Sequence, residues 1–168
     1  MKLNIDPTRS QGDPYVISAR GAYYMYATHP NGVQLYKSKD KYNWDYLGFC
    51  FKREGEKEYW APAVIEFNDK FYMYYSSMPE SESDVHTERI CVAVSDTPDG
   101  QFEFVRQLIS PFSIDAHVVK SGEELFMFYS TNDYEAERAG TLIVVDKMIS
   151  PSKMAGNPVV AVRATIDE

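Results

Sequence analysis

The chain has 168 residues, of which 44% are hydrophobic, enough for one ordinary domain with a sizeable core. Acidic residues outnumber basic residues by 25 to 17 and the net charge is −8, so the phosphate backbone of nucleic acid is not an expected partner. The sequence has no run of eighteen apolar residues, so no membrane span is expected.

The first segment, MKLNIDPTRSQGDPYV, lacks the apolar stretch of a secretory signal peptide, and a cytoplasmic location is therefore expected. The chain has two cysteines, Cys50 and Cys91. Such a pair is interpreted as two small buried side chains rather than as a disulfide or a metal site.

Three similar stretches follow one another along the chain: DPYVISARGAYYMYATH from 13, APAVIEFNDKFYMYYSS from 61 and DAHVVKSGEELFMFYST from 115. In each stretch a methionine follows twelve positions after the first residue, at Met25, Met73 and Met127. Successive stretches begin 48 and 54 positions apart. This period is typical of the four-stranded blades of a β-propeller.

Each stretch predicts two strands joined by a tight turn, and two further strands follow it. The third strands are GVQLYKS, RICVAVS and TLIVVDK, and the fourth are WDYLGF, QFEFVR and PVVAVR. The predicted blades cover about 13–51, 60–106 and 114–163. One short helical turn is predicted over 148–155.

The second strand of each unit is almost continuously apolar or aromatic, as expected for a strand that is covered on both faces. The fold class is therefore all-β, a β-propeller with about three four-stranded blades. Propellers close with about four to eight blades. We therefore expect the protein to continue beyond residue 168, or a second copy to cover the open faces.

Asp13 and Asp115 begin the first strands of units one and three, and Ala61 holds the equivalent position in unit two. The first strand of a propeller blade lines the central channel, so both carboxylates are expected at one funnel. Two interpretations are open: acid and base catalysis on a glycosidic bond, or turn capping by aspartate.

Three other side chains are candidates for substrate binding. Trp60 lies near the funnel mouth, where an indole stacks on a sugar ring or packs between blades. His117 lies two residues after Asp115 on the same strand face, and either supports a water or metal ion or is a hydrogen-bonded structural histidine. Arg138 lies in a loop from which it reaches a sugar hydroxyl or Asp115, if the loop is on the funnel side.

The segments GDPYV, YWAPAV, ERICVAVSDTPDGQF and SIDAHVV, in this order and spacing, resemble glycoside hydrolase family 43. The resemblance covers residues 12 to about 163 and implies a five-bladed propeller. It also implies inverting cleavage of arabinofuranosyl or xylosyl linkages in plant-derived oligosaccharides. Asp13 matches the general base of the family, and Asp115 matches the aspartate that orients and tunes the general acid.

The general acid of the family is a glutamate in a Glu-Gly pair that opens a later blade, and this sequence has none there. Glu54-Gly55 lies between units one and two and is not assigned. The isolated chain is therefore expected to be inactive. Some family members hold a calcium ion or another cation in the channel, but no residue is assigned to one and no cofactor is expected.

Two alternatives to a glycosidase stay open at this point. One is a carbohydrate-binding propeller without hydrolytic activity, suggested by the missing acid. The other is a propeller glycoside phosphorylase, which would need basic residues around the funnel to bind phosphate.

Overall fold

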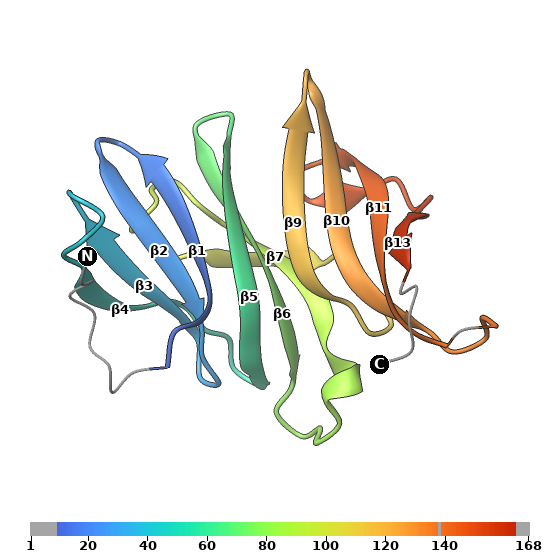
Figure 1. Ribbon diagram of the computed structural model, residues 1–168. Coiled ribbons are helices and arrows are strands. Elements are labelled where there is room, and N and C mark those ends of the chain that lie inside the picture. Colours follow the sequence, from blue (N-terminus) through green and yellow to red (C-terminus); the bar gives the residue numbers. More distant parts are fainter. Residues whose placement is uncertain (1–9, 138, 164–168) are drawn as a thin grey trace.

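The computed structural model describes residues 10–137 and 139–163. Its strands form three antiparallel sheets that stand side by side (Figure 1). The predicted all-β class is therefore confirmed. No helix within these residues is long and apolar enough to cross a membrane.

The first sheet has the strand order β1-β2-β3-β4, so each strand pairs with the next one along the chain. Its strands are β1 (Gly12–Ala19), β2 (Ala22–Thr28), β3 (Val33–Ser38) and β4 (Asp45–Phe51). The turn between β1 and β2 contains Arg20 and Gly21, both with positive φ. A Gly at such a turn position carries no steric cost, which is why Arg-Gly marks this hairpin in the sequence.

The second sheet repeats the same meander, in the order β5-β6-β7-β8. Its strands are β5 (Glu56–Phe67), β6 (Lys70–Pro79), β7 (Arg89–Ser95) and β8 (Glu103–Gln107). A short 3-10 helix, η1 (Val85–Thr87), lies in the connection between β6 and β7. Asp84 caps this helix, because its side chain accepts a hydrogen bond from the backbone N–H of His86.

The third sheet contains β9 (Ile114–Ser121), β10 (Glu124–Asp133), β11 (Gly140–Ser150), β12 (Lys153–Met154) and β13 (Val159–Arg163). Both β12 and β13 pair with β11. The helical turn predicted over 148–155 is wrong, because β11 continues to Ser150 and β12 follows after a two-residue turn. The Asp146 carboxylate fixes this return by accepting hydrogen bonds from the backbone N–H groups of Gly156 and Asn157.

Two apolar clusters fill the seams between neighbouring sheets. The seam between the first and second sheets contains Tyr26, Phe51 and Met73, and the seam between the second and third contains Ile90 and Met127. The central strands β2 and β6 are buried almost throughout, as their continuous apolar pattern predicts. In β10 burial alternates between buried and half-buried residues, because one of its faces packs against the second sheet and the other does not.

A tyrosine hydroxyl crosses each seam. Tyr26 donates to the carbonyl oxygen of Pro98 over 2.6 Å, and Tyr74 donates to that of Pro151 over 2.9 Å. Each tyrosine directly follows the repeated methionine, and each proline lies between the third and fourth strands of the next sheet. Neighbouring blades are therefore joined by the same buried hydrogen bond as well as by apolar contacts.

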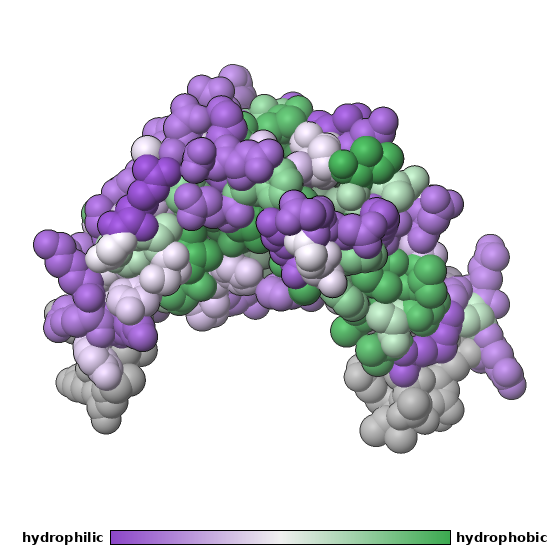
Figure 2. All heavy atoms as spheres, turned by 90° about the horizontal axis from the view of Figure 1, so that it is seen from above, coloured by the Kyte–Doolittle hydropathy of each residue, from purple (hydrophilic) through white to green (hydrophobic). Residues whose placement is uncertain are grey.

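The three sheets form an arch. Seen from above, the molecule is hollowed on one side, and β1, β5 and β9 lie on that side (Figures 1 and 2). The strand β5 packs against both β1 and β9. The first strand of each unit is thus the innermost strand of its blade.

Candidate active site

The same irregularity interrupts the innermost strand of every blade close to its start. The pairing with the second strand shifts at residues 12–15, 60–63 and 114–117. In each case the innermost strand carries one residue more than its partner, which defines a β-bulge.

One residue in each bulge has a left-handed backbone: φ is 48° at Asp13, 42° at Ala61 and 58° at Asp115. This conformation is uncommon for residues other than glycine and costs about 1–3 kcal/mol. Because Ala61 adopts it as well, the conformation belongs to the blade and not to the aspartate side chain. Bulges of this kind re-aim side chains, and here they act at the two acids singled out in the sequence.

The negative charge of Asp13 acts on the carboxyl group of Asp115, although the two residues belong to the first and third blades. Partial desolvation raises the pKa of Asp115, and the negative charge of Asp13 raises it further. Like charges have this effect on a carboxyl group when they share one site. The structure therefore brings the two predicted acids to a common site on the hollow side of the arch.

A ring contact joins the same two strands one step further along. The rings of Tyr15 and His117 lie with their centroids 6.0 Å apart and tilted by 54°. Each residue is two positions after the left-handed aspartate of its strand. His117 thus lies beside the paired acids, and its imidazole is exposed on this side of β9.

Thr28, the last residue of β2, holds the Asp13 carboxylate. Its hydroxyl donates to Oδ2 of Asp13 over 2.7 Å and accepts from the backbone N–H of Ala61 over 2.9 Å. This side chain therefore connects the acid of the first blade to the bulge of the second. No sequence signal points to Thr28, because a threonine at the end of a strand is an ordinary residue there.

Trp60 directly precedes the bulge residue Ala61 and is half-buried. Its indole N–H donates to Oε2 of Glu58 over 3.1 Å. Glu58 also has a left-handed backbone, with φ of 57°. The indole is thus oriented by a carboxylate of its own strand, and the tryptophan belongs to the blade between the two that carry the acids. The other binding candidate, Arg138, lies outside the described residues.

Glu88 was not predicted, yet it is the most buried acid near the site. Its side chain has no exposed surface, and neither carboxylate oxygen has a hydrogen-bond partner among the described residues. Burial raises the pKa of Glu88 to about 8, and the charge of Glu58 adds to the effect. Its backbone carbonyl accepts from the N–H of Ser113, two residues before Asp115. The only sequence signal was an acid directly before an apolar strand.

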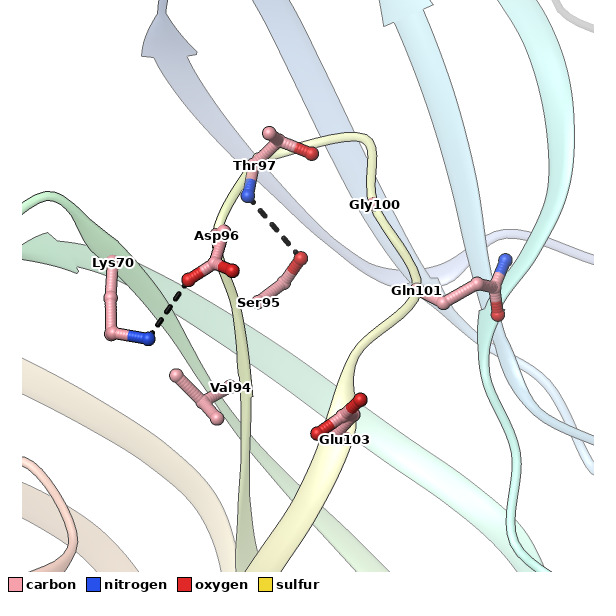
Figure 3. A pocket seen from close by; sticks show the side chains of 8 residues that line it. All are labelled: Lys70, Val94, Ser95, Asp96, Thr97, Gly100, Gln101 and Glu103. Carbon is pink, nitrogen blue, oxygen red and sulfur yellow. Dashed lines mark hydrogen bonds and ion pairs between the residues drawn. The ribbon is translucent and has the colours of Figure 1, made fainter.

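The pocket shown in Figure 3 lies away from the acids. It is lined by residues of the β7–β8 turn together with Lys70, which pairs with Asp96 over 2.8 Å. Lys70 pairs with Phe67, at the end of β5 far from Ala61. This pocket is therefore at the opposite end of the second blade from the candidate site.

No group of three or more His, Cys, Asp or Glu side chains within residues 10–137 and 139–163 is arranged to hold a metal ion. The ring of His117 contacts the ring of Tyr15. Cys50 and Cys91 are both buried and free, as predicted.

Three antiparallel blades around a hollow define part of a β-propeller, and two carboxylates on equivalent bulges give it a candidate acid–base centre. Residues 7–165 match the family described as Glycosyl hydrolases family 43. The chain belongs to this family of glycosidases, as the resemblance of its motifs indicated.

Solved structures of other proteins match almost the whole chain. A solved structure described as a thermostable family-43 glycoside hydrolase is 27% identical, with a TM-score of 0.84 over 99% of this chain and 58% of that chain. The endo-arabinase from Bacteroides thetaiotaomicron is 20% identical, with a TM-score of 0.78 over 96% of this chain and 58% of that chain.

A curated protein also matches part of the sequence. The extracellular exo-alpha-(1->5)-L-arabinofuranosidase ArbA of Cellvibrio japonicus is 31% identical over 74 residues, which is 38% of this chain and 21% of that protein. The chain spans 58% of the length of both solved structures above.

Proposed function

We propose that the protein containing this chain is a glycoside hydrolase that cleaves arabinofuranosyl or xylosyl linkages in plant-derived oligosaccharides, with inversion at the anomeric carbon. The observation that carries the proposal is the pair of coupled carboxylates, Asp13 and Asp115, on equivalent left-handed bulges. Glycosidase chemistry requires carboxyl groups with separate tasks around one bond.

In this proposal Asp13 is the general base. It takes a proton from a water molecule while the water oxygen attacks the anomeric carbon, and the bond to the leaving oxygen breaks. A carboxylic acid gives a proton to that leaving oxygen. Inverting enzymes hold the two carboxyl groups about 6.5–9.5 Å apart, which leaves room for the water.

Asp115 has a positioning role in this scheme. A negative charge beside the general acid raises the pKa of that acid and keeps it protonated near neutral pH. The raised pKa of Asp115 itself supports a site in which carboxyl groups influence one another. Trp60 is assigned to stacking on a sugar ring, and His117 to contact with the substrate beside the acids.

The general acid is assigned to a part of the protein outside residues 1–168. No Glu-Gly pair opens a further blade in the sequence, and the chain spans 58% of the matched family-43 hydrolase. We therefore expect the chain alone to be inactive. Further blades of the same protein are the expected cover for the open face of the third sheet.

Hydrolysis tests this proposal directly. The full-length gene product is incubated with para-nitrophenyl α-L-arabinofuranoside, para-nitrophenyl β-D-xyloside and linear arabinan, and the anomer first released is identified by proton NMR. Release of an inverted sugar without added phosphate is expected. Binding of oligosaccharide without any cleavage would favour a carbohydrate-binding propeller, and turnover that requires phosphate would favour a phosphorylase.

A further inference from the structure

A hydroxyl residue recurs at one position of every blade. Thr28, Ser76 and Ser130 each follow the repeated methionine of the second strand by three residues. Each one also pairs with the residue that directly precedes the left-handed bulge residue of its own blade. The three hydroxyls thus hold equivalent places in the fold, beside Asp13, Ala61 and Asp115.

The bonds of Thr28 show what such a hydroxyl can do. A hydroxyl group has a single proton, and it is directed here at Oδ2 of Asp13. The backbone N–H of Ala61 can only donate, so it takes up an acceptor site of the same oxygen. The N–H therefore leaves the hydroxyl proton to the carboxylate, and this hydrogen bond holds Oδ2 of Asp13 in a defined place.

The surroundings of Thr28 fix its place. Gly12 lies opposite Thr28, and a Cβ atom at Gly12 would approach the Thr28 Cβ atom to 3.4 Å. The buried side chain of Gln34 donates to the carbonyl oxygen of Thr28 over 3.1 Å. The contacts with Gly12 and Gln34 therefore hold Thr28 in place while its hydroxyl is directed at Asp13.

We propose that Thr28 is a positioning residue of the catalytic base. It engages Oδ2 of Asp13, so that Oδ1 receives the proton of the attacking water, and it ties this carboxylate to the bulge of the second blade. This inference rests on the proposed glycosidase function. The proposal also explains the left-handed backbone at Ala61, where no acid is present. The bulge of the second blade supplies its backbone N–H, which donates to the Thr28 hydroxyl.

Ser76 provides a natural control. It holds the equivalent place in the blade that has alanine in the bulge, and its buried hydroxyl has no hydrogen-bond partner within the described residues. Removing this hydroxyl therefore changes a buried side chain of the same kind without removing a bond to a carboxylate.

The experiment compares Thr28→Val, Thr28→Ser and Ser76→Ala in the full-length enzyme. Thr28→Val keeps the shape and loses the hydroxyl, and we expect kcat to fall about 10- to 100-fold while KM changes by less than about twofold. Thr28→Ser should recover most of kcat, and Ser76→Ala should resemble the wild type.

A loss of kcat in Thr28→Val that Thr28→Ser recovers, with KM almost unchanged, reports the lost hydroxyl. Wild-type kcat in Thr28→Val with only a lower melting temperature would show a purely structural role and overturn the proposal. Equal loss in Thr28→Ser would overturn it as well.

A wild-type enzyme that hydrolyses none of the substrates would count against the proposed function and not against Thr28. Crystal structures of the wild type and Thr28→Val then decide the inference. The expected result is a rotated Asp13 carboxylate and a changed backbone at Ala61 in the variant. An unchanged Asp13 carboxylate would refute the positioning role without reference to any activity.

Discussion

The rings of Tyr15 and His117 are 6.0 Å apart although the first residue belongs to the first blade and the second to the third. Each lies two positions beyond a left-handed aspartate, so the contact fixes the relation between the two strands that carry the acids. The blade between them contributes Ala61 at the equivalent position. The packing of the innermost strands therefore brings together the two strands that carry Asp13 and Asp115.

Replacing the proposed base should remove activity without affecting the fold. Asp13→Asn keeps the size of the side chain, and an amide cannot take the proton of water, so kcat should fall about 10²- to 10⁴-fold. Activity assays and melting temperatures of the full-length enzyme check this. A variant with wild-type turnover would contradict the base role.

Asp13→Asn should also change Asp115. The charge of Asp13 is one of two causes that raise the pKa of Asp115, and desolvation is the larger. The pKa of Asp115 should therefore fall in the variant but stay above its ordinary value. Carbon-13 NMR of the Asp115 carboxyl group measures the change, and no change at all would mean that the two acids do not share a site.

Replacing Asp115 should affect the proton donor more than substrate binding. Asp115→Asn removes a negative charge from the site, so the pKa of the general acid should fall and the basic limb of the kcat profile should move to lower pH. KM should change much less than kcat. An unshifted basic limb would count against the tuning role.

The buried carboxyl of Glu88 should make stability depend on pH. Its pKa is raised from 4.5 to about 8 in the folded protein, so the folded state binds a proton that the unfolded state releases. The stabilising contribution is complete below about pH 4.5 and is lost as the pH rises to about 8, a loss on the order of a few kcal/mol.

Glu88→Gln removes this titration with little change in shape. The drop in melting temperature between pH 5 and pH 8.5 should therefore be smaller in the variant than in the wild type, by about 5 °C or more. Identical pH dependence in the two proteins would show that Glu88 is already ionised, with a partner, in the folded state.

The tyrosine hydroxyls across the seams should contribute measurably to stability. Tyr26→Phe removes the hydrogen bond to Pro98 and leaves a buried carbonyl oxygen without its donor, which should cost about 1–2 kcal/mol. The matched change Tyr74→Phe should cost a similar amount at the second seam. Urea denaturation measures both, with the exposed Tyr42→Phe as the control that should stay within about 0.5 kcal/mol.

The repeat made the fold predictable, because a packed propeller blade needs the same apolar pattern each time. The equal spacing of Met25, Met73 and Met127 aligned the strands and thereby identified Asp13 and Asp115 as equivalent residues. The bulges could not be predicted in the same way. Left-handed residues are usually found from glycine, and none of the three bulges has glycine at that position.

Contacts between residues that are far apart in the chain could not be predicted from the sequence either. Thr28 is fifteen positions from Asp13, and its bond to Ala61 crosses from one blade to the next. Glu88 lies in the acidic segment PESESDVHTERI, and charge in the sequence does not reveal which side chains turn inwards. The short strand β12 was mistaken for a helical turn, because two paired residues give no periodic signal.

Ala61 has a wider consequence. Its backbone has the same left-handed conformation as the backbones of the two aspartates. Each of the three blades therefore forms this bulge whether or not the residue in it is an acid. Acids can therefore be gained or lost at these bulge positions by single substitutions, without a change in the backbone. The set of acids on the innermost strands can thus change one blade at a time during evolution.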